Sequence, residues 1–167
     1  ALFPAGVAWA TQSQEPGAKA LAAQLQLAWG DSMLSVARLM QELASKLEGV
    51  ARHAEAQSDA GAVAVRDQLA ETRGVAEALA RLASEHFAAG RKLAREVIAA
   101  APNDYQGYRV AADYYLLLEE WDEFDAMVAK IEALNPGSNG LAFLRGVAAF
   151  ERHGDVTGAR TQLAAAL

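Results

Sequence analysis

Residues 105–136 read YQGYRVAADYYLLLEEWDEFDAMVAKIEALNP, and this stretch decides the fold of the chain. Apolar residues recur every three or four positions on both sides of Glu119 and Glu120, which predicts two amphipathic helices joined by a short turn. Pro136 closes the stretch and lies 34 residues after Pro102, and each proline ends a segment rich in Ala and Leu. A period of this length is typical of stacked helix–turn–helix units.

The same stretch alternates small and large residues in a way that suits close helix packing. Ala111 and Ala112 let two helices approach, while aromatic rings before and after them fill the gaps between turns. On these positions the segment resembles a tetratricopeptide repeat, with Tyr108, Ala111, Ala112, Tyr115, Trp121, Val128, Ile131 and Pro136 at the family's sites. Phe124 stands where the family has a small residue, and we expect it to push the two helices apart or to shift their crossing.

The resemblance extends over residues 87–167. In the following unit Arg145-Gly146 holds the small-pair position, Gly154-Asp155 makes the turn one residue later than usual, and Ala159 and Leu163 fall at the family's places in the second helix. Upstream, Phe87 to Pro102 resembles the second helix of a further unit. The resemblance implies a short solenoid that binds another protein.

The N-terminal half has no such resemblance and is interpreted from its periodicity. We expect residues 1–17 to be an irregular apolar lead-in and residues 18–86 to form a long helical hairpin that turns at 58–61. Two apolar seams should pair the helices with each other, or alternatively with a second chain in a coiled coil. The first seam consists of Leu21, Leu25, Trp29, Val36, Met40, Leu43, Leu47 and Val50, and the second of Val65, Leu69, Thr72, Ala76 and Leu79, with Leu82 beyond. The predicted fold class is therefore all-α, a helical hairpin followed by tetratricopeptide-like repeats.

Composition narrows the classes of function. Apolar residues make up 53 % of the chain, the net charge is −6, and no stretch is strongly basic, so a nucleic-acid partner is not expected. The chain contains no cysteine, which excludes disulfides and thiol chemistry. No apolar run reaches the length of about 20 residues that a membrane-spanning helix needs.

No residue pattern predicts catalysis, a metal or a cofactor. The three histidines, His53, His86 and His153, are far apart and lack the spacing of zinc ligands or of a catalytic base. The acidic residues around Trp121 fit the start of a helix, where they complement its dipole. We therefore expect the protein not to be an enzyme.

The leading functional hypothesis is a scaffold or assembly subunit that binds a protein or peptide. The family resemblance places the partner on the concave face, which here should present Gln106, Arg109, Asp113, Phe143 and Val147. We also expect a homo-oligomer or a longer repeat array, because Leu163 and Leu167 have no following helix to cover them.

The alternative hypothesis is an exported helical carrier of a small ligand, with a pocket between hairpin and repeats. Export is considered because Ala8-Trp9-Ala10 has the small-x-small pattern of a signal-peptidase site. Arg outnumbers Lys, a bias that favours a bacterial source. The absence of cysteine leaves both the cytoplasm and the periplasm open as its location.

Overall fold

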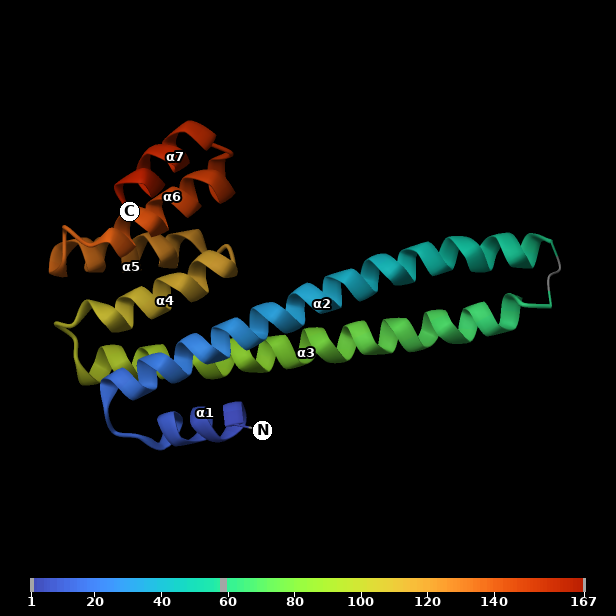
Figure 1. The fold of residues 1–167 in the computed structure, drawn as a ribbon, viewed down its shortest axis with the longest axis horizontal. Helices are drawn as coiled ribbons and strands as arrows, with labels where there is room; N and C mark the ends of the chain where they lie inside the picture. Colours follow the sequence, from blue (N-terminus) through green and yellow to red (C-terminus); the bar gives the residue numbers. More distant parts are fainter. Residues whose placement is uncertain (1, 58–59, 167) are drawn as a thin grey trace. The chain divides into compact units, whose positions relative to one another are not determined.

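The computed structural model describes residues 2–57 and 60–166, and within these ranges it consists of helices joined by turns and short links (Figure 1). The helices of the described ranges are α1 (Leu2–Gln12), α2 (Pro16–Ala56), α3 (Ala62–Ala100), α4 (Tyr105–Leu117), α5 (Trp121–Leu134), α6 (Asn139–His153) and α7 (Val156–Ala165). The predicted all-α class is thereby confirmed. None of these helices has a stretch apolar and long enough to span a bilayer, over the residues that the structure describes.

The expected irregular lead-in is wrong for most of residues 1–17, because α1 occupies Leu2–Gln12. Pro4 does not prevent this helix, since it lies in the first turn, where a backbone N–H has no intrahelical partner in any case. Val7 and Ala10 are buried one turn apart, so α1 has one packed side. The irregular link is confined to residues 13–15, and Pro16 then opens α2 at the helix position that proline favours.

The sequence also predicted that one helix ends at residue 86 and the next begins at Phe87. This is wrong, because α3 continues through Phe87 to Ala100. No proline interrupts residues 62–100, and the glycines there do not break the helix. The chain instead divides into two compact units, residues 28–87 and residues 1–27 together with 88–167. Both long helices contribute to both units.

Of the expected turn at 58–61, Ala60 and Gly61 do form a turn, and Ser58 and Asp59 lie outside the described residues.

In the unit of residues 28–87, α2 and α3 pair antiparallel. Glu48 accepts from Arg73 at 2.8 Å and Glu55 accepts from Arg66 at 2.6 Å, so residue numbers rise along one helix as they fall along the other. At the other end of this unit, the Trp29 and His86 rings meet edge to face at 5.3 Å.

On α2 the buried seam of this hairpin consists of small residues rather than the large ones that the periodicity predicted, whereas on α3 the predicted Leu69, Thr72 and Ala76 are buried. Ala37, Ala44 and Ala51 are buried every seven residues on α2, and Leu69, Ala76 and Ala83 repeat this spacing on α3. Val36, Leu43 and Val50, which were expected in the seam, each lie one residue earlier and are exposed. Small residues at the contact let two helix backbones approach closely, and that approach turns the neighbouring large side chains outward.

In the other unit, Tyr114 of α4 connects α4 to α2 and α3. Its side chain is fully buried, its hydroxyl donates to the Ala23 carbonyl of α2 at 2.5 Å, and its ring lies against Gly90 of α3. A Cβ atom at Gly90 would lie only 1.5 Å from the Tyr114 hydroxyl oxygen. Burial raises the pKa of this hydroxyl above its ordinary value. The glycine is therefore required for the close approach of the tyrosine to α3.

Helices α4 to α7 form two consecutive hairpins, α4 with α5 and α6 with α7, and α6 also contacts both helices of the first hairpin. A core shared by α4, α5 and α6 holds the hairpins together and consists of Ala112, Phe124, Val128, Ile131, Leu141 and Leu144. Phe124, expected to push helices apart, is buried in this core and meets Trp121 edge to face at 6.1 Å. This core fixes where α6 presents its outer face.

Candidate partner-binding groove

The last hairpin is shaped by a sharp turn between α6 and α7. Gly154 ends α6 in the left-handed region, with φ of 64°, a conformation that glycine adopts without strain. Asp155 then caps α7, because its carboxylate accepts the Gly158 backbone N–H at 2.8 Å. The chain therefore reverses within two residues, and α7 lies back along α6.

Gly146 sets the distance between α6 and α7. A Cβ atom there would lie 2.8 Å from Leu163 Cγ and 3.2 Å from the Ala159 carbonyl oxygen, so the helices cross on the bare glycine backbone. Ala159 is buried at this crossing. The glycine and the alanine together fulfil the expectation that small residues make the contact of this hairpin.

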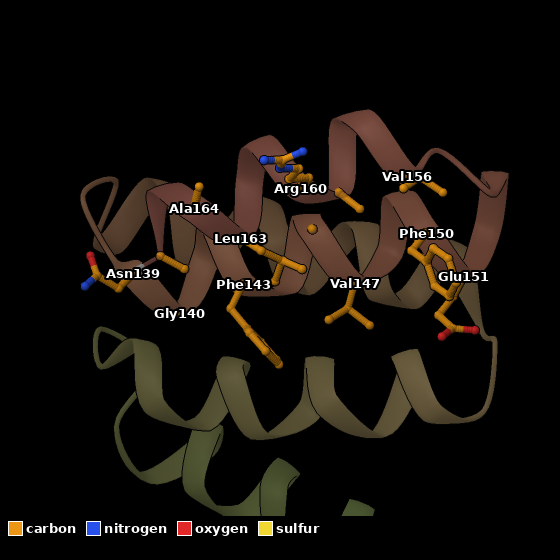
Figure 2. Close-up of a pocket in the computed structure, with 13 residues that line it drawn as sticks. Asn139, Gly140, Phe143, Val147, Phe150, Glu151, Val156, Arg160, Leu163 and Ala164 are labelled. Carbon is orange, nitrogen blue, oxygen red and sulfur yellow. The ribbon is translucent and has the colours of Figure 1, made fainter.

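Beside this crossing lies an open groove of about 890 Å³, which we call the α6–α7 groove (Figure 2). Apolar side chains form most of its lining: Phe143, Val147, Phe150, Val156, Ala159, Leu163, Ala164 and Ala166. Phe143 is 44 % exposed and Phe150 is 51 % exposed, which is unusual for rings of this size. Three polar residues, Asn139, Glu151 and Arg160, also line the groove.

Arg109 of α4 lies over the Phe143 ring. Its guanidinium carbon is 5.7 Å from the ring centroid, and its Nε donates to the Asp113 carboxylate at 3.2 Å. Burial raises the pKa of Asp113 above its ordinary value, and the Arg109 charge and hydrogen bond only partly oppose this. Arg109 is thus held between a carboxylate and a ring, and it positions Phe143 at the edge of the groove.

The structure brings together most of the residues predicted to form the concave face. Arg109 contacts both Asp113 and Phe143, and Val147 lies with Phe143 in the α6–α7 groove. Gln106 is separate, since it lines a smaller hollow of about 400 Å³ near the N-terminal ends of α4 and α6. Arg109 borders this hollow as well.

Sequence reasoning missed the residues that α7 contributes, because it assigned the face to the first helix of each hairpin alone. Val156, Arg160 and Leu163 line the groove from α7. It also missed Phe150, although the spacing of Phe143, Val147 and Phe150 is that of one helical stripe. That stripe could have indicated the groove from the sequence alone, since three large apolar residues on one helix face are usually covered by another element.

Two further findings bear on the site. Over the ranges 2–57 and 60–166, no cluster of three or more His, Asp or Glu residues is arranged to hold a metal ion. Comparison with protein-family models, with curated proteins and with solved structures gives no match for this chain.

Proposed function

We propose that this chain is a non-catalytic scaffold that binds a helical segment of a partner protein in the α6–α7 groove. The observation that carries the proposal is the exposure of Phe143 and Phe150 along one apolar groove. Apolar anchors of this kind supply most of the affinity of helix-in-groove recognition.

The proposal includes a tetratricopeptide-like organisation of residues 105–165. Arg109 and Phe143 are 34 residues apart and in contact, as expected where equivalent positions of neighbouring repeats stack. Gly146 and Ala112 occupy equivalent positions, and both are buried at helix contacts. The open side of α7 is where a further hairpin would pack in a repeat array, so association into a homo-oligomer or a longer array belongs to the same proposal.

The dimensions and chemistry of the groove define the proposed partner segment. The groove follows α6 from Gly140 to Glu151, which corresponds to roughly 17 Å and therefore to a helix of about three turns. Arg160 is exposed on its α7 side and has no ion-pair partner among the described residues. We therefore propose an amphipathic helix with apolar residues at i, i+3 or i+4, and i+7, and a carboxylate placed to meet Arg160.

The groove is less suited to a small ligand. Small-molecule sites are generally enclosed and combine an apolar lining with several converging polar groups. The α6–α7 groove is open along one side, and its polar residues are spread over its length (Figure 2). These features favour a macromolecular partner over the carrier alternative.

Capture of partners from an extract of the native host, followed by mass spectrometry, tests the proposal. The variant Phe143→Ala with Phe150→Ala should lose the partner that the unchanged protein retains, because each large anchor contributes about 2 kcal/mol or more. The matched control is Leu134→Ala, which removes an exposed apolar side chain of α5 outside the groove. Equal capture by the groove variant and the unchanged protein, with both fully helical by circular dichroism, contradicts the assignment.

A further inference from the structure

The hairpin of residues 28–87 has one face that is apolar and uncovered within its own unit. Six large apolar side chains on it, Val36, Leu39, Leu43, Val50, Val75 and Leu82, are between 37 % and 63 % exposed. They come from both helices and belong to neither the α6–α7 groove nor the hairpin's own seam. We call this set the hairpin face.

Helix geometry places the hairpin face opposite the ion pairs of the same hairpin. Leu43 and Val50 each precede a buried alanine by one residue, whereas Glu48 and Glu55 each follow a buried alanine by four. At about 100° per residue, these offsets put the two sets on opposite sides of the alanine row. The hairpin therefore has one side closed by the Glu48–Arg73 and Glu55–Arg66 pairs and one side with large apolar groups in contact with water. An exposed apolar surface of this extent marks a site of association.

The charges along the two edges of the hairpin face differ in sign. Lys46 follows Leu43 by three residues and so borders the face on α2, while Glu71 and Glu85 border it on α3. Lys46 pairs at 2.7 Å with the exposed Glu42, and Arg81 lies 3.9 Å from Glu85. Glu71 has no ion pair within the described part of the chain.

We propose that a second copy of this chain covers the hairpin face, with α2 of each copy lying over α3 of the other. A two-fold axis parallel to the helices produces this arrangement, and it makes every pair of neighbouring helices antiparallel in a four-helix bundle. It also sets the Lys46 edge of one copy against the Glu71 edge of the other. Placing α2 over α2 would instead set like charges against each other.

The register of the hairpin places Lys46 of one copy and Glu71 of the other at nearly the same level, meaning the same height along the helix axes. The contacts of Gly30 with Phe87 and of Glu48 with Arg73 place Lys46 level with about residue 73 of α3. A two-fold axis along the helices preserves levels, so Glu71 of the second copy lies within about 3 Å of the level of Lys46.

The hairpin face is also large enough for a stable dimer. From Val36 to Val50 it runs for about 21 Å, and two helices side by side are about 20 Å wide. Covering it in both copies removes on the order of 1,000 Å² from water, which is about the lower limit for a specific interface.

Light scattering on the eluate of a size-exclusion column tests whether the face joins two copies. The full chain at about 100 µM should elute with twice the mass of one chain, corresponding to a micromolar or tighter dissociation constant. Leu43→Glu should give a monomer with unchanged helicity, whereas Gln41→Glu, an exposed change on the ion-paired side of α2, should leave the dimer intact. A monomeric unchanged protein, or a Leu43→Glu variant that still dimerises, overturns the proposal.

Mixing two charge variants tests how the copies are arranged. Lys46→Glu alone and Glu71→Lys alone each set like charges against each other in their own homodimers. In an equimolar mixture, the heterodimer has opposite charges at both contacts and should form on the order of tenfold more tightly than either homodimer. A mixture that associates no better than its components excludes the arrangement of α2 over α3, even where Leu43→Glu abolishes dimerisation.

Discussion

Gly90 and Tyr114 give the sharpest prediction about how the unit of residues 1–27 and 88–167 is held together. Gly90→Ala places a methyl group 1.5 Å from the Tyr114 hydroxyl oxygen and 2.2 Å from its Cζ atom. The ring has no room to retreat, because it is fully buried and its hydroxyl is hydrogen-bonded to Ala23. Both contacts must therefore be disrupted for the methyl group to fit.

The expected change in the free energy of unfolding on Gly90→Ala is the sum of three contributions. Overpacking a buried contact destabilises by about 1–3 kcal/mol, and displacing the hydroxyl from the Ala23 carbonyl adds about 1 kcal/mol. Alanine in place of glycine inside a helix returns about 1 kcal/mol. We therefore expect Gly90→Ala to lower the free energy of unfolding by about 1–3 kcal/mol.

Urea denaturation followed by circular dichroism at 222 nm measures this change. Gly74→Ala is the matched control, because it lies in the same helix and the methyl group that it adds meets no neighbouring side chain or helix within 4 Å, so it should stabilise by about 0.5–1 kcal/mol. Combining Gly90→Ala with Tyr114→Phe should destabilise less than the sum of the two single changes, since the phenylalanine lacks the clashing oxygen. A Gly90→Ala protein as stable as the Gly74→Ala control refutes the placement of Tyr114.

Three further predictions concern stability. Ala112→Leu should lower the free energy of unfolding by about 1–3 kcal/mol because it overpacks the core shared by α4, α5 and α6, whereas Gln106→Leu at an exposed position of α4 should change the urea midpoint little. Gly146→Ala should destabilise by about 1–2 kcal/mol through contact with Leu163, and Leu163→Ala in the same chain should relieve part of that loss in the same assay. Tyr114 has a raised pKa in the folded state, so stability should be unaffected below about pH 10 and should fall as the pH rises further, where the unfolded state loses the proton first. Tyr114→Phe should flatten that alkaline decline in urea midpoints measured between pH 9 and about pH 11, and an equal decline in both proteins would assign it to other groups.

The sequence predicted the helix class and the hairpins from features that depend on local chemistry. The turn at Glu119 and Glu120, the end of a hairpin at Pro136 and the burial of Ala112 all follow from helix periodicity and from residues that end helices. The concave-face residues Arg109, Asp113 and Phe143 were also predicted to lie together, and they do so in the structure.

The α2 side of the seam in the long hairpin could not be predicted in the same way, although Leu69, Thr72 and Ala76 on the α3 side were. A search for large apolar residues at heptad spacing finds Val36, Leu43 and Val50, and it does not weigh the alanines that lie one position later. The hairpin buries the row of alanines and not the row of larger residues, because alanines allow the two helix backbones to pack closely. This close packing is visible only once α2 and α3 are paired in three dimensions. The surplus of large apolar residues on α2 is the feature from which we propose a second interface.

The role of Arg109 also depended on three-dimensional context. Its sequence position implied a charge presented to the partner, but Asp113, one helical turn later, pairs with it. The charge that faces the groove from α7 is instead that of Arg160. The helix break expected before Phe87 had no proline or turn residue to cause it, and it came from the family pattern alone.

Site-specific photo-crosslinking in the native host tests the central claim most directly, that the α6–α7 groove binds a helical segment of a partner. A photoreactive phenylalanine analogue at Phe150 should crosslink one dominant partner, within an amphipathic helical segment carrying an acidic residue. The same analogue at Leu134, exposed on α5 outside the groove, should not. Crosslinking of that partner from Leu134 and not from Phe150 would contradict the account.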